Sequence, residues 1–228
     1  MEKPIFENAN ELSKAVIRIE PDYETFVPED FRQDPNGYFE TKGKNIKPGE
    51  IKRDGAGKIE EDPTAVKELP VWRDSEGNEL TVIGKRVNPN KGSVRDSGDP
   101  SYESKVIKEL ASAGLPSAKL VAESEQEGTF LSFTERVKGL GWYEKNIFKE
   151  KGLSEADIEN LKGQAEHLMS EMQKQFEDAG ISRGWKLKDM VFDIDFENIK
   201  VRSIIPTDWE RTKIDSKKLE EYKNKHGK

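Results

Sequence analysis

The segment from Ser154 to Gly180 constrains the fold most, because it predicts one long amphipathic helix. Ser154 opens a Ser-x-x-Asp pattern, which is typical of a helix N-terminus, and Gly180 stands where helices commonly end. Between them, apolar residues recur at helical spacing, at Leu161, Ala165, Leu168, Met172 and Phe176. Such a stripe needs a partner surface, so the rest of the chain must supply one.

Strand patterns surround a second, shorter helix in the middle of the chain. Residues 69–72 and 80–87 are apolar runs on either side of a polar turn, and residues 118–122 and 129–137 repeat this arrangement. Between the two pairs, residues 102–113 carry apolar side chains at helical spacing. The sequence therefore predicts an α+β fold.

The two ends of the chain differ from this middle part. Residues 1–62 contain turn-forming groups such as Pro35-Asn36-Gly37, and we expect them to form an arm that is partly disordered or accessory. Short strand-like segments follow the long helix between residues 190 and 206. The charged tail, residues 213–228, is predicted to be a solvated helix.

Charge and residue usage exclude several classes of partner. The chain has 45 acidic and 38 basic residues, and its net charge of -7 argues against binding to nucleic acid. It has no cysteine and two histidines, which excludes thiolate and histidine-rich metal sites. No apolar run reaches about 18 residues and no signal-peptide pattern opens the chain, so we expect a soluble protein without a membrane partner.

Three polar residues near the C-terminal end have a suggestive spacing. Asn198 follows Asp193 by five positions in a polar turn, and Asp208 comes directly after an apolar strand-like run. Further upstream, Lys85 ends a β-type run and Glu103 opens the short helix. Taken alone, the Asp193 to Asn198 segment has a simpler interpretation, which is an Asx turn.

In this order, the five residues resemble the site of the protein-kinase-like superfamily. The resemblance implies a minimal two-lobed fold, with residues 63–138 as a β-rich N-lobe and residues 139–228 as a reduced helical C-lobe. It also implies an ATP-dependent phosphotransferase that uses Mg²⁺, most simply a Ser/Thr or Tyr protein kinase with a protein substrate.

The resemblance assigns a role to each residue. Asp193 is the expected catalytic base, and Asn198 and Asp208 are the expected ligands of Mg²⁺. Lys85 is expected to bind the ATP phosphates, and Glu103 to hold Lys85 in place. The resemblance also places Thr134 at the gatekeeper position, and it assigns adenine recognition to the hinge backbone, at Glu135 and Val137.

The chain departs from the family pattern at several positions. Val191 and Phe192 replace the usual histidine and arginine before the catalytic aspartate, so control by a phosphorylated loop is not expected. Residues 54–59 offer the only candidate for a glycine-rich phosphate loop. Few residues follow Asp208, and this is similar to minimal kinases that bacteria secrete into host cells; a cytoplasmic protein is the other possibility.

Two other functions remain open. The chain could be a kinase-like binding module with weak chemistry, or Asp193-Ile194-Asp195 could be the Asp-x-Asp motif of a metal-dependent transferase. The transferase hypothesis predicts that Asp195→Ala abolishes activity while Lys85→Ala is mild, and the kinase hypothesis predicts the opposite ranking. The substrate and the oligomeric state cannot be predicted from the sequence.

Overall fold

The computed structural model describes residues 15–47, 51–53, 59–61, 65–87, 98–141, 145–209 and 211–226. It is a mixed α+β structure built on a six-stranded antiparallel sheet. The strands follow one another in the order β1 (Val16–Ile19), β9 (Leu120–Gln126), β10 (Thr129–Glu135), β8 (Val82–Arg86), β5 (Val66–Glu68) and β2 (Lys44–Lys47). Two short hairpins accompany the sheet, β3 (Ile51–Arg53) with β4 (Ile59–Glu61), and β6 (Trp72–Arg73) with β7 (Glu79–Leu80).

One face of this sheet is covered by the segment that was expected to be an arm. The 3-10 helix η1 (Pro21–Tyr23) leads into helices α1 (Glu29–Gln33) and α2 (Pro35–Lys42). Phe31 and Phe39 are fully buried there against Trp72 and Phe133. Because residues 16–47 supply two strands and part of the core, the structure corrects the prediction of an arm for this part of residues 1–62. Residues 1–14 lie outside the described residues.

A predicted turn in that segment is the start of a helix. Pro35 occupies the first turn of α2, where its missing N–H is no loss, and the carboxylate of Asp34 caps the helix by accepting from the Gly37 amide at 2.9 Å. The group Pro35-Asn36-Gly37 therefore belongs to a capped helix and not to a loop.

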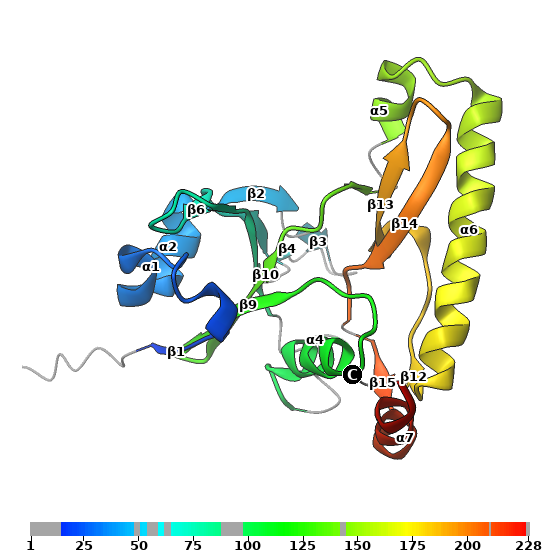
Figure 1. The fold of residues 1–228 in the computed structure, drawn as a ribbon. Coiled ribbons are helices and arrows are strands. Elements are labelled where there is room, and N and C mark those ends of the chain that lie inside the picture. Colours follow the sequence, from blue (N-terminus) through cyan, green and yellow to red (C-terminus); the bar gives the residue numbers. More distant parts are fainter. Residues whose placement is uncertain are drawn as a thin grey trace, which may run out of the picture.

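Helix α4 (Tyr102–Ser112) lies between the sheet and the second part of the chain (Figure 1). That second part contains β11 (Leu140–Gly141), α5 (Lys145–Glu150), α6 (Glu155–Asp178), β12 (Ile181–Ser182), the 3-10 helix η2 (Leu187–Asp189), β13 (Met190–Asp195), β14 (Lys200–Pro206), β15 (Lys213–Ile214) and α7 (Ser216–His226). Strands β11, β13 and β14 form one small sheet, and β12 pairs with β15.

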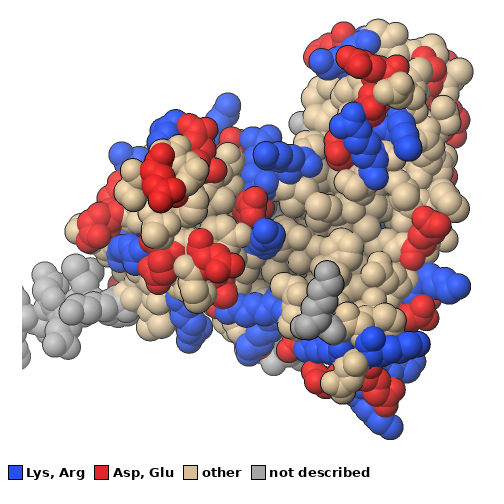
Figure 2. Space-filling model, in the orientation of Figure 1, with Lys and Arg blue, Asp and Glu red and all other residues tan. Residues whose placement is uncertain are grey.

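The long helix finds its partner surface in this second part. Ser154 and Asp157 form the expected capping box, which confirms the predicted start of α6. Leu161 and Phe176 are fully buried in a core that α6 shares with α4, β13, β14 and α7. A separate core lies between the sheet, α1 and α2, and the surface is indented between the two parts (Figure 2). Within the residues that the structure describes, no helix has the length and apolar character needed to cross a membrane.

Candidate functional site

Lys85 and Glu103 form an ion pair where the sheet meets α4. Successive side chains of β8 point to opposite faces of the sheet, so Lys85 and Ile83 face α4 while Arg86 faces α2. Lys85 Nζ donates to Glu103 Oε2 at 2.8 Å, and the exposed fractions of the two side chains are 18% and 5%. The structure thus brings together two of the residues that the sequence singled out.

The second oxygen of Glu103 connects this pair to the end of β14. Glu103 Oε1 accepts a hydrogen bond from the main-chain amide of Trp209 at 3.2 Å. The Trp209 ring is fully buried and stacks on Phe176 of α6, with ring centroids 5.7 Å apart. Because Trp209 is held from both sides, Asp208, the preceding residue, is fixed close to the Lys85–Glu103 pair.

Other polar contacts hold α4 in the position that this pair requires. Lys108 Nζ bonds to the buried carboxylate of Glu123 on β9 at 3.0 Å, which ties the helix to the sheet. Lys223 Nζ of α7 bonds to Glu109 Oε2 at 2.5 Å, which ties the helix to the second part of the chain. Helix α4 is therefore fixed to both parts of the structure.

Arg183 lies in the loop between β12 and η2 and stacks on two tryptophan rings. Its guanidinium lies 4.7 Å from the ring centroid of Trp209 and 5.2 Å from that of Trp185. Both distances are within the range of cation–π attraction. Nη1 of this guanidinium is buried and has no hydrogen-bond partner among the described residues.

Three carboxylates surround Arg183 electrostatically. Burial lowers the pKa of the Arg183 guanidinium, and the negative charges of Asp208, Asp189 and Glu103, in this order, oppose that shift. All three acids are therefore within electrostatic range of one guanidinium. Two of them, Asp208 and Glu103, were predicted site residues, while Asp189 and Arg183 were not.

Asp189 is brought to Asp208 by the pairing of β13 with β14. Met190 pairs with Pro206 at the end of this ladder, so the residues just outside it, Asp189 and Thr207, are neighbours. The Thr207 amide donates to the Asp189 carbonyl oxygen at 3.0 Å. Asp208 follows Thr207 directly, and the side chains of Asp189 and Asp208 are both half-buried.

Asn198 lies at the opposite end of the same hairpin, which is long and narrow in Figure 1. Its side-chain amide donates to Asp195 at 3.0 Å and its main-chain amide donates to the same carboxylate at 3.1 Å, so the Asx-turn interpretation is confirmed for this segment. Strand β14 separates Asn198 from Asp208 by roughly 20 Å at about 3.3 Å per residue. Two ligands of one Mg²⁺ lie at most about 4 Å apart. The structure therefore contradicts the prediction that Asn198 and Asp208 share a metal ion.

Asp193 is also separated from the other predicted site residues. It is exposed in the middle of β13, opposite Ser203, and three residues from the end that meets Asp208. That interval corresponds to about 10 Å along a strand. The structure thus brings Lys85, Glu103 and Asp208 together, and it does not bring Asp193 or Asn198 to them.

The predicted hinge is the segment that leaves the sheet toward β11. Thr134 lies opposite Ile83 in the ladder, on the same face as Lys85. The Glu135 amide donates to the Lys119 carbonyl at 2.8 Å, and the Glu135 carboxylate accepts from the Tyr23 hydroxyl at 3.1 Å. The Glu135 amide is therefore engaged within the fold, so the predicted adenine recognition would rest on the main-chain carbonyl of Glu135 and on Val137.

Beyond Val137, the chain runs close to β13. Gly139 has a φ of 138°, and a Cβ atom there would lie 2.4 Å from the carbonyl oxygen of Phe192. Leu140 then pairs with Phe192. Glycine is thus required where this connecting segment meets the second part of the chain. The candidate phosphate loop, residues 54–59, lies outside the described residues except for Ile59.

Asp189 and Asp208 could hold a divalent cation. No group of three or more His, Cys, Asp or Glu side chains that could bind a metal occurs in the described part of the chain. Mg²⁺ in phosphate-binding sites takes only one or two protein carboxylates, with phosphate oxygens and water as its other ligands. Two half-buried carboxylates that both lie within electrostatic range of the Arg183 guanidinium fit this requirement.

A search of protein-family models finds no match for this sequence, and neither does a search of curated proteins.

Proposed function

We propose that the chain binds Mg²⁺ and ATP where the sheet meets the second part of the chain, in a minimal two-lobed arrangement similar to that of protein kinases. The observation that carries the proposal is the ion pair of Lys85 with Glu103 Oε2. The other carboxylate oxygen of Glu103 accepts a hydrogen bond from the main-chain amide of Trp209, the residue after Asp208. Three segments far apart in the sequence thus converge on one carboxylate. Their order along the chain is the order that the kinase resemblance requires.

In this proposal each side chain has a task that its surroundings support. Lys85 binds phosphate oxygens, and its bond to Glu103 keeps the ammonium oriented. Asp189 and Asp208 hold Mg²⁺, which neutralises charge on the phosphates when it is bound. Val137 offers its backbone to adenine at the end of β10. The Asp-x-Asp hypothesis receives no support, because Asp195 is engaged in a hairpin turn with Asn198.

The reaction that we propose is transfer of the γ-phosphoryl group of ATP to a hydroxyl of a protein substrate. In the kinase pattern, the catalytic base stands five residues before the metal-binding asparagine of the catalytic loop. If Asp189 takes the place of that asparagine, the position of the base falls on Gly184. Glycine cannot accept a proton, and a general base contributes roughly 10²- to 10⁴-fold to the rate. This favours slow transfer, and it gives specific support to the second candidate, a kinase-like binding module.

Calorimetric titration with Mg-ATP, run beside transfer of radiolabelled phosphate, tests both candidates. We expect wild type and Asp193→Ala to bind Mg-ATP alike, and Asp208→Ala to lose binding by tenfold or more, about 1.4 kcal/mol. Measurable labelling of a protein by wild type supports the phosphotransferase, and binding without labelling supports the binding module. No binding by wild type, or equal binding by Asp208→Ala, would overturn the proposal.

A further inference from the structure

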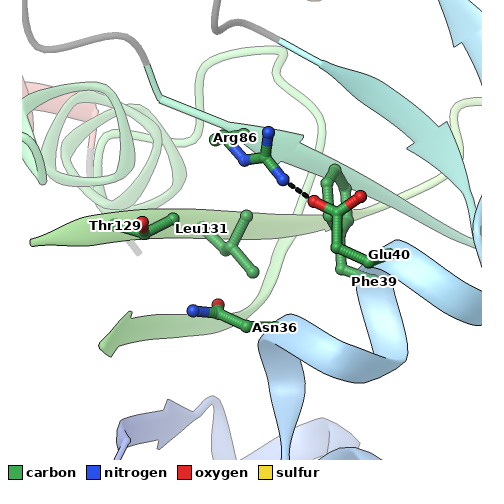
Figure 3. A pocket seen from close by; sticks show the side chains of 6 residues that line it. All are labelled: Asn36, Phe39, Glu40, Arg86, Thr129 and Leu131. Atoms are coloured by element: carbon green, nitrogen blue, oxygen red, sulfur yellow. Dashed lines mark ion pairs between the residues drawn. The ribbon is translucent and has the colours of Figure 1, made fainter. Parts of the chain in front are cut away.

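A cavity lies on the face of the sheet opposite to Lys85, between α2 and strands β8 and β10 (Figure 3). Residues three and four apart share a face of a helix, so Asn36, Phe39 and Glu40 of α2 all face the sheet here. Arg86 and Leu131 are cross-strand neighbours. Together with Thr129 these residues enclose about 280 Å³.

The lining of this cavity mixes apolar and polar groups, and its polar groups distinguish it from the core next to it. Further along, the same interface between helix and sheet is filled by Phe31, Trp72 and Phe133. At the cavity, Phe39 and Leu131 are accompanied by amide, hydroxyl and charged groups, and Figure 3 shows Arg86 and Asn36 on opposite sides of Leu131. A recess with an apolar wall and a few polar groups can accept a small molecule that has both apolar and polar parts.

Among the described residues, the charged groups at this cavity leave one positive charge in excess. Glu40 is shared by two cations, because Lys67 Nζ bonds to Oε2 at 2.7 Å and Arg86 forms an ion pair with Oε1. Lys67 and Arg86 also lie over the ring of Phe39, at 4.7 Å and 5.6 Å from its centroid. Two cations against one carboxylate favour an anionic ligand, and a guanidinium has five N–H groups, so it can bind a carboxylate in addition to Glu40.

Asn36 adds a requirement for a hydrogen-bond donor. Its side-chain Oδ1 is buried and has no partner among the described residues. A buried acceptor of this kind is normally satisfied by protein, by water or by a ligand. Across the cavity from Arg86, it matches a ligand that carries an N–H group close to its negative charge.

We propose that this cavity binds a small carboxylate with an adjacent amide N–H, which is the chemistry of an N-acyl amino acid or of the carboxyl end of a peptide. The carboxylate meets Arg86, the N–H meets Asn36 Oδ1, and the rest of the ligand contacts Phe39 and Leu131. The volume is at the lower end for ligand sites, which suits one terminal residue better than a large cofactor. Because Arg86 and Lys85 point to opposite faces, the inference does not depend on the proposed nucleotide site.

Calorimetric titration of the full chain tests the proposal with four probes: N-acetylalanine, acetate, a short peptide ending in alanine, and the same peptide with an amidated end. We expect N-acetylalanine to bind saturably and acetate at least tenfold more weakly. Binding of the free-acid peptide in addition identifies a peptide end as the source, and binding of N-acetylalanine alone identifies a small molecule. Equal binding of the amidated and free-acid peptides, or no saturable binding of any probe, overturns the proposal.

Variants then assign the binding to this cavity. Arg86→Gln leaves Glu40 paired with Lys67, and Asn36→Leu removes the acceptor at similar size, so both variants are expected to keep the fold. Each should weaken N-acetylalanine binding by tenfold or more. Arg73→Gln is the matched control, because Arg73 pairs with Glu79 on the exposed β6–β7 hairpin. Unchanged affinity in folded Arg86→Gln and Asn36→Leu, or an equal loss in the control, contradicts the assignment.

Discussion

The main-chain carbonyl of Asp189 accepts hydrogen bonds from both the amide and the hydroxyl of Thr207, at 3.0 and 3.2 Å. These two bonds close the open end of the β13–β14 hairpin and bring Asp189 to Asp208. The other end of the hairpin, around Asn198, is a solvent-exposed turn. The two acidic residues thus lie at the end of the hairpin near Arg183, which is where we propose that the cation binds.

This arrangement predicts which residues a metal ion needs. We expect Asp189→Ala to weaken Mg-ATP binding by about tenfold or more, since one of two carboxylate ligands is lost. Asn198→Ala should bind Mg-ATP like wild type, because its side chain bonds only within the turn. Calorimetry with Mn-ATP in place of Mg-ATP provides a second measurement of the affinities of the two variants, and we expect the same ranking. The reverse ranking of the two variants would restore the assignment based on the sequence.

The sequence predicted the regular elements well where periodicity was strong. The long helix with its cap at Ser154, the helix that begins at Tyr102 and the hairpin of β9 and β10 are all confirmed. The N-terminal segment was predicted wrongly because Pro35 and Gly37 are turn formers in isolation. Only the tertiary packing of Phe31 and Phe39 on the sheet shows that they belong to a helix.

The candidate site was predicted only in part, because some of its residues stand in recognisable sequence patterns and others do not. Lys85 and Glu103 could be found because each stands at a defined position of a recognisable strand or helix. The spacing of Asp193 and Asn198 favoured a catalytic loop, yet the same composition also forms a hairpin turn. Asp189 and Arg183 carried no pattern of their own. A search for acidic residues just before the first strand of the hairpin that ends near Asp208 could have indicated Asp189.

Gly184 offers a test by gain of function. It has no positive φ, and a Cβ atom there would meet nothing within 4 Å, so aspartate fits without strain. If phosphoryl transfer is slow because a base is missing, Gly184→Asp should raise the labelling rate by roughly 10²-fold. Gly163, whose Cβ position is equally open, provides the control variant Gly163→Asp. No increase with unchanged Mg-ATP affinity would show that the base position lies elsewhere.

The ion pair of Lys85 and Glu103 should contribute measurably to stability. Glu103→Ala leaves a partly buried ammonium without its carboxylate and the Trp209 amide without its acceptor, so we expect a loss of about 3 kcal/mol in urea unfolding. Glu79→Ala removes an exposed pair with Arg73 and should cost less than about 1 kcal/mol. If the two variants lose similar amounts of unfolding free energy, the buried pair contributes no more to stability than the exposed pair does.

The hairpin turn at Asp195 should make stability depend on pH in the acidic range. Hydrogen bonds from Asn198, and then from Arg202, hold the pKa of the Asp195 carboxyl well below its usual range. A depressed pKa in the folded state stabilises the protein above the unfolded pKa of about 3.9, and this stabilisation is lost as the pH falls below that value. We therefore expect Asp195→Asn to melt at a lower temperature than wild type at about pH 7. The difference should shrink at about pH 3, and a difference that stays constant would contradict this account.

Arg183 should oppose metal binding at the proposed cation site. Its positive charge acts on both Asp189 and Asp208, so Mg²⁺ must bind against it when no nucleotide is present. We expect Arg183→Met to bind Mn²⁺ on the order of tenfold more tightly than wild type, and Arg183→Lys, which keeps the charge, to stay close to wild type. Tryptophan fluorescence can follow the titration, because Arg183 stacks on Trp209 and Trp185. Weaker Mn²⁺ binding by both variants would mean instead that stacking of the guanidinium positions Asp208, and that its charge matters less than its shape.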